Sequence, residues 1–415
     1  MSRPDYDVAI VGGGVVGAAL AALLVRQARI DPQRVLLVER ELEDGGTIAP
    51  PAVDAPFDLR VWALSQASRN VLRAAGAYDL LDSARVQPYE AMRVWHEGST
   101  AESRDALRFE AVAVGAVDLG VIVENRAVQA ALLSGCIAAG VVPQRDTLVS
   151  LTQSASAVQL QLQSRQCTAA LLIGADGAAS RVRQLAGITS TERSYGQQAI
   201  VANLQCELPH QQTAWQVFLD TGPLALLPLP GNHCSLVWSM IDARVPQLLE
   251  LSADEFSAAL TRASGGVLGR LQLTSARAHF PLRRLAAQRY VAGRCVLVGD
   301  AAHVIHPLAG QGVNQGLLDA AALCDAVAQR PPQEDVGALR LLRRYERGRR
   351  SGNALVGGLM DALDHLLSRP PDMAGRLARE GMSVVARSAL LRQWFARQAM
   401  GTAGEAPAAA RGVFS

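Results

Sequence analysis

The chain has 415 residues and a mass of 43.9 kDa, which predicts two or three domains. Hydrophobic residues make up 49% and charged residues 19%, a composition typical of a globular protein. All 40 basic residues are arginine, which excludes pyridoxal-phosphate enzymes and P-loop NTPases because both need a lysine. The 38 acidic residues leave a formal net charge of +2, so no extended nucleic-acid-binding surface is expected.

Cysteine usage and the N-terminal segment bear on the cell compartment. The six cysteines are isolated, without a CxxC pair, which fits a reducing compartment and predicts no metal site. Residues 8–25 form an apolar run long enough to suggest a signal peptide or a membrane span. However, Asp5 and Asp7 precede the run and glycines interrupt it. We therefore expect a cytoplasmic protein, with peripheral contact with the inner membrane left open.

The N-terminal part has the pattern of a strand–helix–strand unit. Residues 7–11 are short, branched and apolar and predict a buried parallel strand. Helix formers follow over residues 18–27, and a second buried strand is predicted at Val35–Glu39. A loop rich in proline and glycine then spans residues 41–56, before a predicted helix over residues 65–75.

The pattern changes in the middle of the chain. Residues 158–162 alternate and, with 171–177, predict a half-exposed antiparallel pair. Strand-like segments over 200–241, including 224–229, predict a second, mainly antiparallel sheet. Beyond a helix at Ala253–Ala263, the pattern predicts a buried strand over 295–300, a helix over about 312–330, and mostly helical structure to the end. Residues 401–415 are predicted to form a flexible tail.

A glycine-rich turn joins the first strand to the first helix. Gly12, Gly14 and Gly17 form a GxGxxG pattern, in which the glycines permit a tight turn, approach of a pyrophosphate and close helix packing. Glu39 follows 22 residues after Gly17, at the end of the second strand, where its carboxylate can accept hydrogen bonds from ribose hydroxyls. The pattern predicts a dinucleotide, FAD or NAD. A 2′-phosphate there would meet like charge, which makes NADP a poor fit.

Two further motifs favour FAD. Residues 174–183, GADGAASRVR, resemble the DG motif of the para-hydroxybenzoate-hydroxylase-like flavoprotein monooxygenases, and residues 299–303, GDAAH, resemble their GD motif. The resemblance implies cofactor-binding roles for Asp176 and for Asp300, which would bind the ribityl chain of the flavin. It also implies that residues 306–314 run under the isoalloxazine ring. We expect cofactor contacts there from Gly310, Gly312, Val313 and Asn314.

The resemblance narrows to the ubiquinone-biosynthesis hydroxylases. It rests on RVWALS at 60–65, VENRAVQ at 123–129, GPLALLPL at 222–229 and YER at 345–347, and with the glycine pattern it covers the chain to about residue 391. By analogy, Arg60 and Gln129 would contact the pyrophosphate region of FAD.

The implied fold is α/β, with a Rossmann-like FAD-binding domain, an interleaved antiparallel-sheet substrate domain and C-terminal helices. We assign residues 1–75, 105–185 and 290–345 to the FAD-binding domain, 76–104 and 186–289 to the substrate domain, and 346–400 to the C-terminal helices.

The resemblance implies an aromatic-ring hydroxylase. FAD would be reduced by NAD(P)H, which binds transiently, and would react with O2 to form a C4a-hydroperoxide that passes one oxygen to the ring. The substrate implied is a polyprenylated phenol or quinol precursor of ubiquinone, with the apolar residues 224–229 as a candidate channel wall. Two alternatives stay open, namely a hydroxylase of a small soluble phenol and a non-catalytic flavoprotein subunit of a biosynthetic complex.

Two histidines and one arginine cluster complete the candidate residues. His306 could accept a substrate proton beside the flavin, whereas His303 lies at a helix start and is better explained by a structural role. Residues 340–350 hold six arginines in eleven residues, a pattern that indicates either a solvated helix face or contact with an anionic membrane or partner protein.

Overall fold

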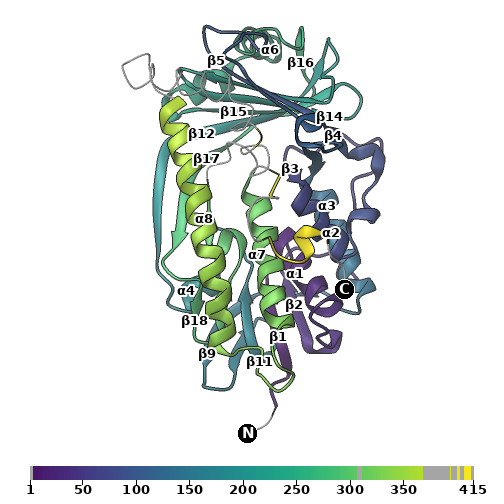
Figure 1. Ribbon diagram of the computed structural model, residues 1–415, viewed down its shortest axis with the longest axis vertical. Coiled ribbons are helices and arrows are strands. Elements are labelled where there is room, and N and C mark those ends of the chain that lie inside the picture. The colour runs from purple at the N-terminus through teal and green to yellow at the C-terminus, as the bar shows by residue number, and fades with distance from the viewer. Residues whose placement is uncertain (1–2, 306–310, 368–392, 394–399, 402–405, 413–415) are drawn as a thin grey trace.

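The chain folds around two large sheets that lie at opposite ends of the molecule (Figure 1). The computed structural model describes residues 3–305, 311–367, 393, 400–401 and 406–412, and for 359–367 it describes the backbone alone. A three-stranded sheet lies near the junction of the two large sheets and contains β3 (Val61–Ser65), β7 (Gly120–Glu124) and β4 (Gln87–Tyr89).

The eight-stranded sheet is built around parallel pairs. Its strands are β1 (Tyr6–Val11), β2 (Val35–Glu39), β8 (Gln144–Arg145), β9 (Leu148–Gln153), β10 (Val158–Leu162), β11 (Gln166–Gly174), β18 (Val291–Ala292) and β19 (Cys295–Leu297). Strand β1 pairs in parallel with β2 and β11, which confirms both predicted parallel strands. Strand β10 is antiparallel as predicted, but its partner is residues 166–169 of β11. The prediction of a half-exposed antiparallel strand over 171–177 is wrong, because residues 171–174 of β11 are buried and pair in parallel with β1.

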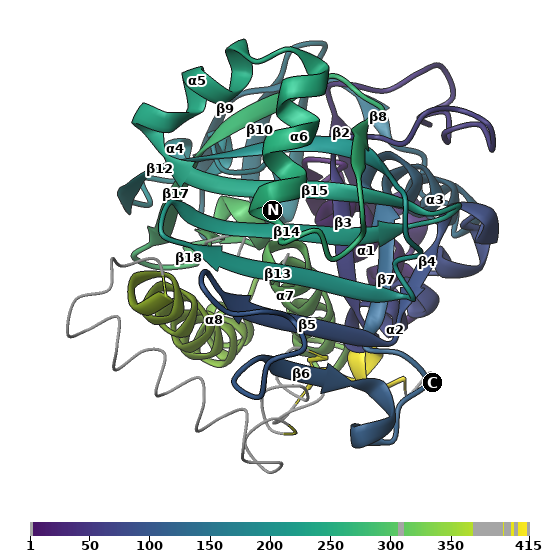
Figure 2. The same cartoon turned by 90° about the horizontal axis from the view of Figure 1, so that it is seen from above.

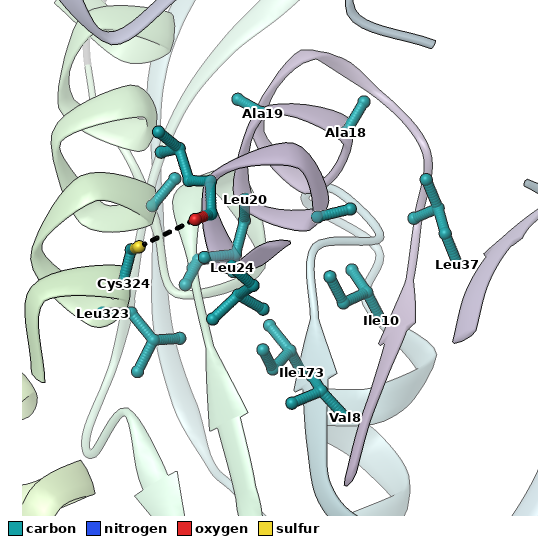
Figure 3. Packing of buried hydrophobic residues seen from close by; sticks show 14 of the residues in the cluster. Val8, Ile10, Ala18, Ala19, Leu20, Leu24, Leu37, Ile173, Leu323 and Cys324 are labelled. Carbon is teal, nitrogen blue, oxygen red and sulfur yellow. Dashed lines mark hydrogen bonds between the residues drawn. The ribbon is translucent and has the colours of Figure 1, made fainter. Parts of the chain in front are cut away.

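Helices cover this sheet and bury their apolar residues against it. The helices are α1 (Val15–Arg26), α2 (Gln66–Ala74), α3 (Asn125–Ala138), α4 (Arg181–Leu185) and α7 (Gln311–Ala328). Residues 18–24 of α1 are all buried, and α1 packs against α3 and α7. Figure 3 shows Leu20 and Leu24 of α1 beside Cys324 of α7, whose thiol donates a 3.4 Å hydrogen bond to the carbonyl of Leu23. Helix α1 begins three residues earlier than predicted, because Gly14 is its N-cap.

The nine-stranded sheet is antiparallel apart from one pair. Its strands are β5 (Ala91–His96), β6 (Leu107–Glu110), β12 (Ser190–Cys206), β13 (Thr213–Leu219), β14 (Gly222–Leu229), β15 (His233–Ile241), β16 (Leu271–Leu273), β17 (Ala278–Ala287) and β20 (His303–Val304). Only β13 and β5 pair in parallel. Helices α5 (Val245–Glu250) and α6 (Ala253–Ala263) lie over its outer face (Figure 2), where Phe256 and Leu260 enter a core with alternate residues of the strands.

The sheet pairing changes two details of the predicted domain division. Strand β6 pairs with β5 and strand β20 pairs with β17, so both belong to the nine-stranded sheet although they fall inside ranges predicted for the FAD-binding domain. The boundary predicted at residue 105 is therefore too early, because β6 completes a hairpin with β5. The remaining division into domains stays a proposal.

Two C-terminal segments pack on the helical layer. Helix α8 (Leu339–Leu367) lies along α7 and is tied to β19 by a 2.8 Å hydrogen bond from the Tyr345 hydroxyl to the carbonyl of Leu297. The prediction of a flexible tail is wrong for residues 406–412. Ala409 and Ala410 are buried, and Asn70 of α2 donates a 2.9 Å hydrogen bond to the carbonyl of Ala410. Small side chains allow this close approach to α2.

Candidate FAD-binding site

The glycine-rich turn between β1 and α1 has the geometry that a dinucleotide requires. Gly12 has a φ of +106°, and a Cβ on it would lie 2.3 Å from the carbonyl oxygen of Ala175. A Cβ on Gly17 would lie 1.9 Å from the carbonyl oxygen of Gly12. In contrast, a Cβ on Gly14 would meet nothing within 4 Å, and no side chain caps the N-terminus of α1. The turn therefore leaves backbone N–H groups open to an anionic ligand.

Glu39 and Gln129 meet at this turn. The Glu39 carboxylate accepts a 2.7 Å hydrogen bond from the N–H of Gly13, and its other oxygen accepts from the N–H groups of Arg40 and Glu41. The Gln129 amide donates to the carbonyl of Gly13 at 3.1 Å. A carboxylate offers about four lone-pair positions. Glu39 thus keeps acceptor capacity for a ribose hydroxyl while it holds the turn in place.

Asp300 is the carboxylate best prepared to bind a ligand. It lies in a single 3-10 turn, Gly299–Ala301, directly after β19, and it is half-buried. Burial raises the pKa of the Asp300 carboxyl, and interaction with His303, Arg60 and Arg283 works in the opposite direction. Its oxygens accept no hydrogen bond from the part of the chain that the structure describes. A half-buried carboxylate without a donor is suited to the hydroxyl groups of a ribityl chain.

A buried network supports the turn that carries Asp300. Asp319 of α7 is fully buried, and one of its oxygens accepts from the N–H of Gly299 at 3.0 Å and lies 2.6 Å from His303 Nε2. Its other oxygen accepts a 2.6 Å hydrogen bond from Nε of Arg349 in α8. Although burial raises the pKa of Asp319, its contacts with His303 and Arg349 hold that pKa well below its usual range. These contacts favour a structural role for His303.

The DG motif is held by its own side chains. Asp176 accepts hydrogen bonds from the N–H groups of Arg181 and Val182, at 2.7 and 3.0 Å, and so caps helix α4. Arg183, a buried residue, donates to the carbonyl of Ala301 at 2.9 Å and ties the DG motif to the GD motif. These contacts of Asp176 are to the protein, and its contact with the cofactor stays a prediction.

The start of α7 is joined to the segment that carries Arg60. Asn314 accepts hydrogen bonds from the N–H of Ser65 at 3.0 Å and from the Ser68 hydroxyl at 2.6 Å, and it donates to the carbonyl of Ala63. Val313 is buried, and a Cβ on Gly312 would meet nothing within 4 Å. His306 and Gly310, both predicted site residues, lie outside the described residues.

Arg60 lies near Asp300. Its guanidinium stacks over Trp62, 4.6 Å from the ring centre, and its charge acts on Asp300. The structure therefore brings the glycine turn, Glu39 and Gln129 together, and it places Arg60 near Asp300. Because the open turn, the uncapped helix and the carboxylate without a donor all suit FAD, the residues fit this cofactor.

A family model described as an FAD binding domain matches residues 5–356. The chain belongs to this FAD-binding family. The flavoprotein is 38% identical to ubiquinone hydroxylase UbiL of Rhodospirillum rubrum over 98% of this chain and 93% of the relative. It is 36% identical to the 3-demethoxyubiquinol 3-hydroxylase of Escherichia coli over 94% of this chain and 98% of the relative. The resemblance inferred from the motifs is thereby confirmed, and the chain is an FAD-dependent monooxygenase.

Solved structures show the fold of the flavoprotein. The p-nitrophenol 4-monooxygenase PnpA of Pseudomonas putida superposes with a TM-score of 0.73 at 16% identity and covers 97% of this chain and 100% of its own. The Diels-Alderase PyrE3 superposes with a TM-score of 0.71 at 22% identity, over 96% of this chain and 80% of its own. The predicted fold class is thus confirmed. Because the second neighbour is described by a different reaction, the fold alone does not identify the substrate.

Sequence reasoning missed the residues beneath the site. Asp319 and Arg183 touch the backbone or the histidine of the GD motif, and Arg349 binds Asp319. One signal was available for Asp319, which stands among apolar residues of a helix that is otherwise buried. A charge in such a position indicates a buried partner.

We expect Asp300→Ala to weaken FAD binding by about tenfold or more, because a hydrogen bond to a charged group contributes about 1.5–3 kcal/mol. Titration of the apoprotein with FAD, followed by flavin fluorescence, measures this. Glu39→Ala should weaken binding through the adenosine end. Asp242→Ala, at an exposed position beside α5, is the control. FAD affinity equal to the parent in both site variants would contradict the assignment.

Proposed function

We propose that this flavoprotein hydroxylates the aromatic ring of a polyprenylated phenol or quinol in ubiquinone biosynthesis. The similarity to two ubiquinone-pathway hydroxylases over nearly the whole chain carries the proposal. FAD, when bound, supplies the oxygen-activating chemistry, with NAD(P)H as the transient reductant and O2 as co-substrate. The chain itself binds FAD, orients it and excludes water from the reacting ring.

The nine-stranded sheet offers a wall for the substrate. Alternation along β14 sends Leu224 and Leu226 into the outer core with α6, so they are not available to a channel. Ala225 and Leu227 lie on the other face, which also carries Asn203 of the neighbouring part of the sheet. The Asn203 amide donates a 2.7 Å hydrogen bond to the carbonyl of Phe57, so this face looks toward the FAD-binding region. We therefore assign the inner residues of β14, and not the whole strand, to the channel.

A comparison of two phenols tests the substrate class. Purified holoprotein is given NAD(P)H, O2 and either a polyprenylated phenol or the same phenol without its chain, and hydroxylated product is quantified by mass spectrometry. We expect product with the prenylated phenol and at least a tenfold smaller yield without the chain. Equal yields support the small-phenol alternative, and absence of product with both supports a non-catalytic subunit. Asp300→Ala, assayed without added FAD, serves as the flavin-depleted control.

His306 is proposed as the acceptor of the substrate proton. The proposal rests on its position in the segment that follows the GD motif. His303, three residues earlier in the chain, forms a hydrogen bond with Asp319 through Nε2, so this nitrogen cannot accept the substrate proton.

Arrival of a lipid substrate requires contact with a membrane or a carrier. No helix within the described ranges has the length and apolar character that spanning a bilayer needs. Helix α8 instead exposes Arg343, Arg344 and Arg347, none of which forms an ion pair with another described residue. Arg349 points inward to Asp319, so the six-arginine cluster is not one continuous surface. We propose weak contact of these exposed arginines with anionic lipid.

Vesicle sedimentation tests this contact. We expect binding to anionic vesicles at low salt that is lost at high salt, because each arginine contributes at most about 1 kcal/mol near an anionic surface. Changing Arg343, Arg344 and Arg347 to Gln should abolish it. As a control, three exposed arginines beside the nine-stranded sheet are changed to Gln, namely Arg244, Arg262 and Arg270. This removes the same charge and should leave vesicle binding unchanged. Binding that survives high salt would instead indicate an apolar surface, and absence of binding would favour delivery by a partner.

A further inference from the structure

One buried arginine holds the proline-rich loop that precedes Arg60. Arg85 lies in a 3-10 turn, Ser83–Arg85, and its side chain is 3% exposed. A single guanidinium nitrogen of Arg85 donates to three loop carbonyls, those of Ala52 at 2.7 Å, Val53 at 3.0 Å and Ala55 at 2.9 Å. This one side chain therefore adds three hydrogen bonds to an irregular stretch whose own backbone bond runs from the N–H of Ala55 to the carbonyl of Ala52.

The same guanidinium is paired with a buried carboxylate. Nε and the second terminal nitrogen of Arg85 donate to the two oxygens of Glu124 at 2.7 and 2.8 Å, and the Glu124 side chain is 1% exposed. Glu124 also accepts a 2.7 Å hydrogen bond from the N–H of Asp58. Because the guanidinium donates to both carboxylate oxygens, the pair fixes the relative orientation of the two side chains as well as neutralising their charges. The second terminal nitrogen also donates to the carbonyl of Pro56 at 3.4 Å, so all five N–H groups of the guanidinium point at the loop or at Glu124.

The loop is also tied from the opposite sheet. The ring of Phe57 lies under the Arg85 guanidinium, 4.9 Å from its centre, and the carbonyl of Phe57 accepts the hydrogen bond from Asn203 of β12. Asn203 is 2% exposed. The loop is consequently held by β7 on one side and by the nine-stranded sheet on the other.

Arg60 follows this fixed segment immediately. Its carbonyl accepts a 2.9 Å hydrogen bond from the N–H of Asn125, the residue after Glu124. The Asn125 side chain in turn accepts from Nε1 of Trp62 at 3.0 Å, and Trp62 is the ring on which Arg60 stacks. Two consecutive residues, Glu124 and Asn125, therefore set both the loop and the place of the Arg60 side chain.

We propose that Arg85 and Glu124 are positioning residues for FAD, acting through Arg60. They fix the backbone from residue 52 to residue 60, so that the Arg60 guanidinium is held near Asp300, ready for the diphosphate of the dinucleotide. The inference rests on the proposed contact of Arg60 with FAD. FAD binding is measured without an aromatic substrate, so failure of this inference is distinguishable from failure of the substrate proposal.

A double-mutant cycle on FAD affinity tests the coupling. Arg85→Met with Glu124→Met removes both charges together, because loss of one alone would leave the other buried and unpaired, whereas an apolar pair of similar volume is often tolerated. We expect this variant and Arg60→Ala each to raise the FAD dissociation constant about tenfold. Combined, they should raise it no more than Arg60→Ala alone, because interacting residues are non-additive. A merely structural role for the pair would give additive effects.

Two controls keep the result decisive. Arg34→Met with Asp7→Met removes another ion pair, with a 2.7 Å contact, at the far end of β1 and should leave FAD affinity unchanged. Arg85→Lys keeps the positive charge but loses the planar set of N–H donors, and it is the test variant if the double variant does not fold. It should weaken FAD binding and speed hydrogen exchange at the Asp58 amide. Unchanged FAD affinity in folded variants, additivity with Arg60→Ala, or an Arg60→Ala variant with parental affinity would each overturn the proposal.

Discussion

Asp319→Asn is expected to lower the free energy of unfolding by about 3–5 kcal/mol, the range for removal of one partner from a buried ion pair. The carboxylate is fully buried and neutralises Arg349, whose side chain is 13% exposed, while it also binds His303. An amide has one oxygen in place of two and no charge, so it cannot serve both partners. The turn that carries Asp300 should loosen with it, because the single amide oxygen cannot accept both from the N–H of Gly299 on one side and from Arg349 on the other.

The pH dependence of this effect has a definite sign. The folded pKa of Asp319 lies below its unfolded value of about 3.9. A lowered folded pKa contributes stability that is fully present above the unfolded pKa and is lost as pH falls through the folded pKa. The difference between parent and variant should therefore stay constant from pH 7 to about pH 5 and narrow in stronger acid.

Urea unfolding of the parent and variant apoproteins at pH 7, at about pH 5 and in stronger acid measures the difference in their free energies of unfolding. Asp325→Asn is the matched control, because Asp325 lies in the same helix but is only partly buried and accepts one 2.9 Å hydrogen bond, from the N–H of Ala408. We expect it to lower stability by about 1 kcal/mol. If the two variants lose equal stability, the buried ion pair of Asp319 does not contribute the free energy of unfolding that we predict for it.

Adding one methyl group at two glycines of the same turn should have opposite consequences. A Cβ on Gly17 would lie 1.9 Å from a backbone oxygen, so Gly17→Ala must displace β1 or α1. We expect a loss of about 3 kcal/mol or more of stability, because overpacking of a rigid contact is not relieved by side-chain movement. Gly14 has a φ of −67° and open space around it, so Gly14→Ala should leave the apoprotein stable. Its methyl group would instead enter the space for the pyrophosphate and weaken FAD binding about tenfold or more.

Thermal unfolding of the apoproteins and FAD titration separate these effects. Gly17→Ala should unfold at a markedly lower temperature even without FAD. Gly14→Ala should unfold at the parental temperature without FAD and gain less stability than the parent when FAD is added. A Gly14→Ala variant that binds FAD like the parent would show that the pyrophosphate does not approach this turn.

Local sequence signals predicted the elements whose cause is local. Strands β2 and β10 and helix α6 have the predicted bounds. For α6, a capping box between Ser252 and Glu255 marks the first turn, so the start of the helix is determined by residues three apart. The glycines of the β1–α1 turn likewise act on neighbours that follow from the strand–helix pattern. These features need no knowledge of the rest of the chain.

The sequence by itself thus determined the glycine-rich turn and the family, and it predicted Glu39 and Asp300 as carboxylates that bind the cofactor. The tertiary structure decided what holds them. Arg85 meets Glu124 across 39 positions, and Asp319 meets Arg349 across 30. It also decided that Asp176 caps a helix, that β6 joins the nine-stranded sheet and that residues 406–412 pack on α2. The reason is physical: whether a charge is solvated or buried beside a counter-charge depends on which distant segments the sheets bring together, and periodicity along the chain has no information on that pairing.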